Sequence, residues 1–240
     1  MSKDFLQSEN FKTRTTTGIV LACIVIVSFF TPCANVFRAF FIAAGIMSGI
    51  ELYLAHVAGC TRGITMPNEH VITFEYLIII LAMYSIGFYL ERYEILLVVL
   101  GAVSTDIFAY FVGSAFHDRL FKTRPFPRVS PKKSWEGIFG GVIGCIAVLL
   151  VTLQIMKIPF SHYLFFIFAC PLAAIFGDFF ASFCKRFLKI KDSSDYIYTS
   201  ALYFPKLCEK LMKGHGGYLD RIDSISAVAC LMFCIKLATL

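Results

Sequence analysis

The segment Ile95–Phe116, ILLVVLGAVSTDIFAYFVGSAF, decides which class of fold this sequence can adopt. Its only charged residue is Asp106, and most of its other side chains are apolar. A helix needs about 20 predominantly apolar residues to cross the hydrocarbon core of a bilayer. The segment is therefore predicted to be a transmembrane helix.

Six other segments have a similar apolar character, and they flank this one on both sides: 16–31, 36–58, 71–90, 137–157, 161–181 and 224–240. Hydrophobic residues make up 58% of the 240-residue chain and charged residues 16%, whereas about 25% of residues are charged in an average soluble domain. The first segment lacks the small-residue cleavage site of a signal peptide, so an uncleaved helix is expected. Apolar runs of this length, without hairpin turns, also argue against a β-barrel. We predict an all-α integral membrane protein with about seven transmembrane helices, which excludes ordinary cytosolic enzymes and secreted disulfide scaffolds.

The basic residues predict an orientation. With the N-terminus in the cytoplasm, 18 of the 22 Lys and Arg residues fall on the inner side, as the positive-inside rule requires. Most of them lie in two basic cytoplasmic loops, 117–136 and 182–223. This placement accounts for the net charge of +6, so no nucleic-acid partner is expected.

Carboxylates within or beside the predicted spans gather on the inner side of the membrane midplane. They are Glu51, Glu75, Asp106, Asp178, Asp220 and Asp223. Because a carboxylate in a bilayer is costly unless it is paired or hydrated, the set indicates a polar cavity open to the cytoplasm. Capping of helix ends or exposure to water is an equally good interpretation of Glu51 and Glu75.

The first basic loop contains SPKKSWEGIFGG, residues 130–141. Two hydroxyl groups flank Lys132 and Lys133, which is compatible with a phosphate-binding turn. Attraction of the two lysines to anionic lipid head groups is the simpler alternative. The run of small residues from Gly137 to Gly144 can serve helix packing, either within one chain or between two.

The second loop ends in GHGGYLDRIDS, residues 214–224. Asp220 and Asp223 share one face of a helix that starts there, and together with Asp178 they could hold Mg²⁺. The glycine turn could bring backbone N–H groups to an anion at the start of that helix. With the cations around Lys185, this combination indicates phosphoryl or nucleotidyl chemistry. Capping of the helix by the two carboxylates is the alternative.

Three blocks of the sequence together resemble the phosphatidate cytidylyltransferases, also called CDP-diacylglycerol synthases. One block is Asp106-x-x-Ala109-Tyr110-x-x-Gly113, and the second is SPKKSWEGIFGG, with Ser134 where threonine is common. The third joins Ser182-x-x-Lys185-Arg186-x4-Lys191-Asp192-Ser193-Ser194 to His215-Gly216-Gly217-x-x-Asp220-Arg221-x-Asp223-Ser224. The blocks follow the family order over residues 106–224, which is about half the chain.

The resemblance implies an enzyme that transfers the cytidylyl group of CTP to phosphatidic acid, giving CDP-diacylglycerol and pyrophosphate. The implied catalytic residues are Asp178, Lys185, Arg186, Lys191, Asp192, His215, Asp220 and Asp223. The implied substrate-binding residues are Ser130, Lys132, Lys133, Arg221, Gly216, Gly217 and Asp106. Mg²⁺ is expected on Asp178, Asp220 and Asp223, and a second, monovalent cation is compatible with the resemblance. Residues 1–95 then form N-terminal transmembrane helices, and residues 96–240 form the catalytic region.

The resemblance also implies the inner membrane of a bacterium, an active site facing the cytoplasm and, as in other family members, a homodimer as one expected state. The segment 193–214 is longer than in typical members, and its insert, residues 196–212, is either an amphipathic membrane-surface segment or a plain loop. Two other functions are alternatives to cytidylyl transfer to phosphatidic acid. A secondary transporter is disfavoured because no internal repeat is found. A related CTP-using enzyme with another lipid acceptor, such as a polyprenol kinase, stays open.

Overall fold

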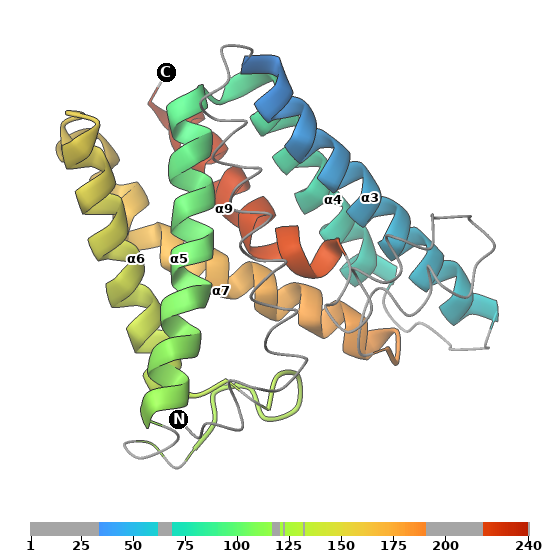
Figure 1. Ribbon diagram of the computed structural model, residues 1–240. Helices are drawn as coiled ribbons and strands as arrows, with labels where there is room; N and C mark the ends of the chain where they lie inside the picture. The colour runs from blue at the N-terminus through green and yellow to red at the C-terminus, as the bar shows by residue number, and fades with distance from the viewer. Residues whose placement is uncertain are drawn as a thin grey trace, which may run out of the picture.

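The computed structural model describes residues 34–61, 69–116, 121, 123–131, 133–190 and 218–239 (Figure 1). Its helices are α3 (Ala34–Thr61), α4 (Glu69–Tyr84), α5 (Arg92–Phe116), α6 (Trp135–Ile155), α7 (Leu164–Phe187) and α9 (Leu219–Ala238). A π-helical turn, Ser85–Tyr89, extends α4, and a 3-10 turn, Phe160–Tyr163, precedes α7. No β-strand occurs in these ranges, which confirms the all-α prediction.

Five helical segments are long and apolar enough to cross a membrane. They are Arg38–Val57, His70–Tyr89, Arg92–Phe116, Trp135–Ile155 and Phe160–Phe187. They coincide with five of the seven predicted spans, so the protein is a multi-pass membrane protein. The predicted segment 16–31 lies outside the described residues. The last predicted span, 224–240, falls on α9, which carries charged residues near both ends and is not one of the five. The total of seven spans and the orientation therefore stay predictions.

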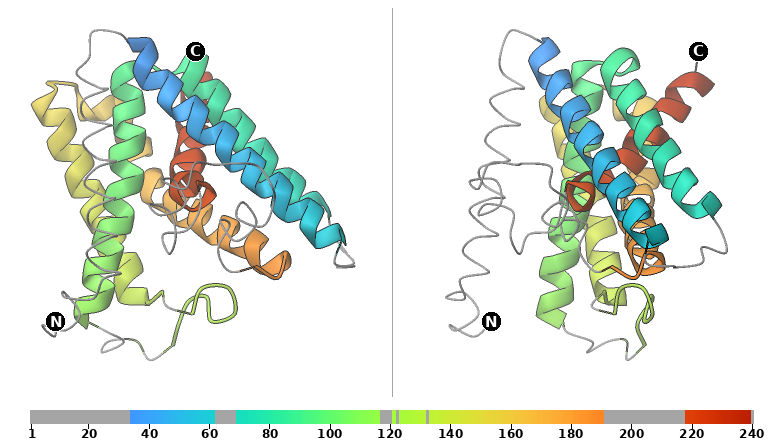
Figure 2. Two further views of the ribbon diagram at one scale, coloured as in Figure 1. Left: turned by 45° about the vertical axis from the view of Figure 1, so that its right-hand side comes forward. Right: turned by 90° about the vertical axis from the view of Figure 1, so that its right-hand side faces the viewer.

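The helices form two antiparallel pairs joined by two crossing helices (Figures 1 and 2). α3 lies along α4, and α5 lies along α6. In Figure 1, α7 crosses behind the α5–α6 pair and continues beneath the α3–α4 pair, and α9 begins near the middle of the bundle and runs toward the end where α5 begins. The α4–α5 and α6–α7 connections lie at one end of the bundle, opposite the ends of α5 and α7 that lead into the two basic segments. This alternation agrees with the predicted order of inner and outer connections.

Glycines of α6 allow α5 and α6 to approach each other closely. A Cβ atom on Gly141 would lie 2.8 Å from the carbonyl oxygen of Thr105, and one on Gly137 would lie 2.8 Å from that of Ala109. The small-residue run from Gly137 to Gly144 therefore packs within the chain, against α5. Small residues allow such backbone proximity between membrane helices.

Two buried apolar clusters hold the bundle together. The larger one joins α5, α6, α7 and α9 around fully buried side chains such as Leu149 and Val228. The smaller one joins α3 and α4 to the end of α7 and the start of α9 through Leu52, Ile72, Leu188 and Leu219, among others. The smaller cluster fixes the first turn of α9 against α3 and α4.

α7 extends further than the sequence prediction. It continues to Phe187, so that Ser182, Lys185 and Arg186 lie in its last turns instead of in the predicted loop 182–223. The apolar residues Phe183, Cys184 and Phe187 continue the helical pattern, and basic side chains are favourable at a helix C-terminus. Likewise, α9 already includes Asp220, Arg221 and Asp223. These side chains are therefore held on helices.

Candidate functional site

Gly177 lets the backbones of α7 and α9 meet. A Cβ atom at this position would lie 2.5 Å from the carbonyl oxygen of Asp223 and 2.8 Å from Cβ of Ala227. No side chain fits into that space without moving one of the helices. The close contact sets Asp178, the next residue on α7, beside Asp223 on α9.

Asp106, Asp178 and Asp223 form a carboxylate cluster from three helices. Asp223 is buried and precedes the predicted span 224–240; burial raises the pKa of its carboxyl, and the charges of Asp178 and Asp106 raise it further. The backbone N–H of Ser224 donates to Asp223 Oδ1 at 2.7 Å, and its hydroxyl donates to Asp106 Oδ2 at 3.4 Å. Asp106 remains exposed although it lies within an apolar span, which requires a hydrated or paired environment.

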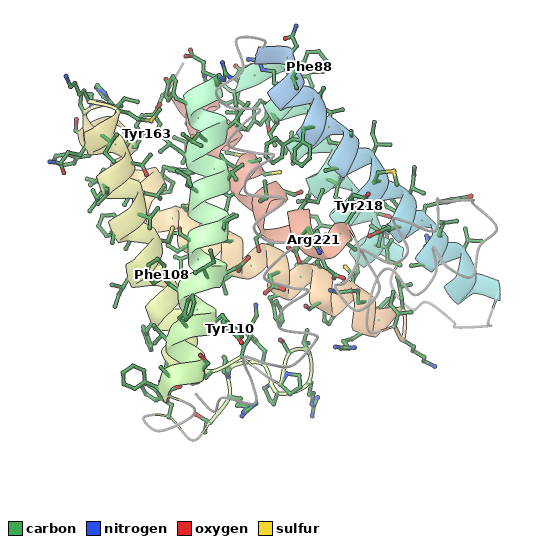
Figure 3. All side chains as sticks on the ribbon, in the orientation of Figure 1. Phe88, Phe108, Tyr110, Tyr163, Tyr218 and Arg221 are labelled. Carbon is green, nitrogen blue, oxygen red and sulfur yellow. The ribbon has the colours of Figure 1, made fainter. Side chains whose placement is uncertain are left out.

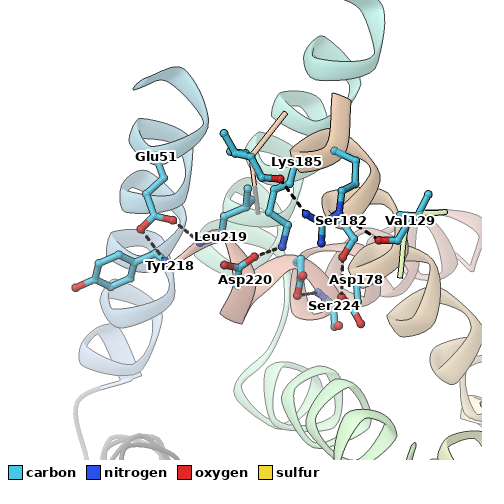
Figure 4. Close-up of polar contacts among 12 residues, drawn as sticks. Glu51, Val129, Asp178, Ser182, Lys185, Tyr218, Leu219, Asp220 and Ser224 are labelled. Atoms are coloured by element: carbon cyan, nitrogen blue, oxygen red, sulfur yellow. Dashed lines mark hydrogen bonds and ion pairs between the residues drawn. The ribbon is translucent and has the colours of Figure 1, made fainter. Parts of the chain in front are cut away.

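Two lysines form ion pairs with acidic groups of the site, and Figure 4 shows one of them, Lys185. Lys185, on the last turn of α7, forms an ion pair with Asp220 on α9. Lys133, just ahead of α6, forms an ion pair with Asp178, whose Oδ1 also accepts from the Ser182 hydroxyl at 3.5 Å. Each of these two carboxylates on α7 and α9 is thus paired with a lysine.

The first basic loop is tied to the site by local contacts. Ser134 is the N-cap of α6, because its Oγ accepts from the backbone N–H of Gly137 at 3.1 Å. Glu136 Oε1 accepts from the N–H of Phe121 at 2.9 Å. On α7, Arg186 Nε donates to the carbonyl of Val129 at 3.4 Å. The backbone N–H of Lys133 donates to the carbonyl of Ser130 at 3.2 Å. Residues 130–133 therefore form a turn that ends at Lys133.

The start of α9 is held from α3. Both carboxylate oxygens of Glu51 accept backbone hydrogen bonds at 2.8 Å, from the N–H of Tyr218 and of Leu219 (Figure 4). Tyr218 and the half-buried Arg221 lie between α5 and the α3–α4 pair (Figure 3). Glu51 therefore acts as a helix cap supplied by a distant segment, which is one of the two interpretations left open by the sequence.

The structure brings together nine of the fifteen predicted site residues. They are Asp106, Lys133, Asp178, Lys185, Asp220 and Asp223, with Ser130, Arg186 and Arg221 around them. Six predicted site residues lie outside the described residues: Lys132, Lys191, Asp192, His215, Gly216 and Gly217. The predicted insert, 196–212, also lies there. Within the described part of the chain, no three His, Cys, Asp or Glu side chains converge closely enough, as they stand, to hold a metal ion.

The sequence predicted Glu51 only as one of six inner-side carboxylates, without a catalytic or binding role, and it predicted no role for Gly177. One signal pointed to Glu51: the residue ahead of α9 is Tyr218, which cannot cap a helix as Ser, Asp or Asn would, so an acceptor from elsewhere was needed. Gly177 precedes the predicted site residue Asp178, and this position could have drawn attention to it. Only the contact between α7 and α9 shows that the position requires glycine.

The fold and the site define a class of protein: a multi-pass membrane protein with paired lysines and carboxylates at the end of its apolar helices. Residues 5–199 match the cytidylyltransferase family. The chain belongs to this family.

Individual relatives agree with the assignment. The chain is 30% identical over 234 residues to a phosphatidate cytidylyltransferase of Rickettsia typhi, covering 91% of this chain and 90% of that protein. It is 36% identical over 131 residues to a phosphatidate cytidylyltransferase of Thermotoga maritima, covering 52% of this chain and 42% of that protein. It is 34% identical over 126 residues to the chloroplastic phosphatidate cytidylyltransferase 4 of Arabidopsis thaliana, covering 52% of this chain and 27% of that protein. The matched region is thus less than half of the last two proteins.

Proposed function

We propose that this protein transfers the cytidylyl group of CTP to phosphatidic acid, giving CDP-diacylglycerol and pyrophosphate. Family membership supports the nucleotide, and the lipid acceptor is supported by the relatives, which are phosphatidate cytidylyltransferases. The apolar spans support an acceptor that stays in the bilayer, since they hold the site at a membrane.

One observation carries the proposal: Lys133 and Lys185 stand beside Asp178, Asp220 and Asp223 where α7 meets α9. Both substrates are anions, so the main obstacle to the reaction is their mutual repulsion. Ammonium groups at this position can offset that repulsion and hold the phosphates in line. Arg186, which follows Lys185 on α7, and Arg221, which follows Asp220 on α9, add two more cations to these helices.

The reaction needs little proton transfer. The phosphate of the lipid is ionised near neutral pH, and one of its oxygens attacks the α-phosphorus of CTP. A phosphorus–oxygen bond forms there as the bond to the pyrophosphate leaving group breaks. A site that offers cations and alignment without a nucleophile–base pair is suited to this chemistry.

Mg²⁺ belongs to the same proposal. Asp178, Asp220 and Asp223 would hold it, because carboxylate oxygens are the ligands that this hard cation prefers. The Gly177 contact sets Asp178 beside Asp223, which supports a shared cation at this place, and Asp106 is proposed to support the ion. When bound, the ion supplies charge neutralisation to the triphosphate. A second, monovalent cation is proposed on the family resemblance.

The remaining parts of the proposal concern location and assembly. We place the protein in the inner membrane of a bacterium, with the site facing the cytoplasm, where CTP is found. The distribution of basic residues supports this orientation, and the Rickettsia and Thermotoga relatives support the bacterial source. The partners are CTP, phosphatidic acid and the bilayer, with a homodimer as the proposed assembly.

The test is pyrophosphate release by the purified protein in mixed micelles. CTP, Mg²⁺ and phosphatidic acid are supplied together, and then each is left out or CTP is replaced with ATP. Release that requires both CTP and phosphatidic acid supports the proposal. Release with another lipid acceptor in place of phosphatidic acid would favour a related lipid enzyme, and absence of release with every lipid would overturn the assignment.

A further inference from the structure

The residue at the N-cap of α9, Tyr218, does not cap the helix with its own side chain. Tyr218, immediately ahead of the helix, already has helical backbone angles, φ −64° and ψ −38°, and its own side chain makes no cap hydrogen bond. The first four N–H groups of any helix lack acceptors within it. In a membrane protein they must find acceptors elsewhere, because unsatisfied backbone groups away from water are costly.

Glu51 supplies these acceptors from α3, more than 160 positions earlier in the chain. One oxygen accepts from Tyr218 and the other from Leu219, each at 2.8 Å. Because both oxygens are engaged, the carboxylate determines the position of the helix start as well as its rotation. A negative charge is also favourable at the positive end of the helix dipole.

Apolar packing also holds the start of α9 against α3. Leu219 is 1% exposed and belongs to the smaller cluster together with Leu52 and Ala55, which lie one and four positions after Glu51 on α3. Glu51 itself is 0% exposed. A buried carboxylate is tolerated only where hydrogen bonds compensate its desolvation. The N–H groups of Tyr218 and Leu219 supply these hydrogen bonds to Glu51, and Glu51 in turn supplies their acceptors.

The first turn of α9 carries acidic groups of the site. Asp220 follows Leu219 directly, and Asp223 lies one turn beyond. A displacement of the helix start moves both carboxylates relative to Lys185 and Asp178 on α7. We propose that Glu51 is a positioning residue for the reaction: through Tyr218 and Leu219 it sets the distance between the acidic groups of α9 and the groups of α7. This inference rests on the proposed function.

The arrangement also limits where substrate phosphates bind. A helix N-terminus commonly offers its N–H groups to phosphate. At α9, two of these groups are already bound by Glu51. Glu51 thus directs the phosphates toward the lysines, away from the backbone of Tyr218 and Leu219.

The test compares Glu51→Gln and Glu51→Ala with a matched control, Glu94→Gln. Glu94 is also a buried carboxylate near a helix start, and it accepts from the N–H of Glu91 at 2.7 Å. It pairs with Lys236 and thus lies at the other end of α9, far from the site. Hydrogen–deuterium exchange of the peptide containing Tyr218 and Leu219 measures the cap directly. Exchange should become about tenfold faster in Glu51→Ala, less so in Glu51→Gln, and stay unchanged in Glu94→Gln.

A second readout tests positioning. Binding of Mn²⁺ in the presence of CTP, followed by calorimetry, should weaken about tenfold in Glu51→Ala, whereas the KM for phosphatidic acid should stay within twofold. Normal exchange at Tyr218 and Leu219 overturns the inference. Faster exchange with Mn²⁺ affinity and kcat equal to those of Glu94→Gln also overturns it, because Glu51 would then be a structural cap only. If Glu51→Ala does not fold, Glu51→Gln carries both measurements.

Failure of the proposed function gives a different result. In that case wild-type protein releases no pyrophosphate from CTP and phosphatidic acid, while the exchange measurement on Glu51 still reports whether the cap exists. Loss confined to the Glu51 variants, with an active wild type and an active Glu94→Gln, supports the positioning role.

Discussion

The replacement Gly177→Ala tests the α7–α9 contact that underlies the site. The new Cβ atom would lie 2.5 Å from the carbonyl oxygen of Asp223, whereas carbon atoms in ordinary contact stay about 3.5 Å from their neighbours. The helices must therefore separate by about 1 Å. Such overpacking typically costs about 1–3 kcal/mol of stability, and a displacement of about 1 Å at reacting groups can lower the rate about 100-fold.

The assay is pyrophosphate release with CTP, Mg²⁺ and phosphatidic acid, together with thermal unfolding in detergent. Gly49→Ala is the matched control: it makes the same chemical change within a helix, but nothing lies within 4 Å of the new Cβ atom. Gly177→Ala should remain folded and lose about 99% of its activity, and Gly49→Ala should retain wild-type activity. Activity of Gly177→Ala within twofold of Gly49→Ala would refute the reasoning.

Asp223→Asn should leave the protein folded and lower pyrophosphate release about 100-fold or more, because it removes a buried carboxylate that we propose as a ligand for Mg²⁺; near-normal turnover would exclude the metal role. Lys185→Met removes the ammonium paired with Asp220 and should raise the KM for CTP about tenfold; an unchanged KM would argue against phosphate binding by this lysine. Lys157 has a left-handed φ of 56° just after α6, so Lys157→Gly should stabilise the protein by about 0.5–1 kcal/mol with unchanged activity. A lower melting temperature would contradict this expectation.

Much of the fold could be predicted because a bilayer leaves few choices. Segments such as 71–90 and 95–116 are apolar over the length of a span, and backbone groups in lipid must be satisfied within a helix. Helix ends were less predictable. The basic residues Lys185 and Arg186 looked like part of a loop, but they continue α7, because Phe183 and Phe187 keep the helix packed beyond the apolar segment.

Part of the site was predictable for a similar reason. The spacing of Asp220 and Asp223 places them on one face of a helix whatever the surroundings. Which groups they meet was not predictable, because Lys185 pairs with Asp220 through a contact between different helices. Sequence patterns report the immediate neighbours of a residue, and ion pairs of this kind depend on how helices cross.

The sequence by itself determined a membrane protein, the approximate positions of its helices, and an acidic and basic inventory suited to nucleotidyl transfer. These properties depend on hydrophobic length, charge and local spacing. Only the tertiary structure decided that Gly177 joins α7 to α9, that Lys133 pairs with Asp178, and that Glu51 caps a helix more than 160 positions later. Each of these contacts joins segments far apart in the chain, and only packing of the whole bundle brings such segments within hydrogen-bonding distance.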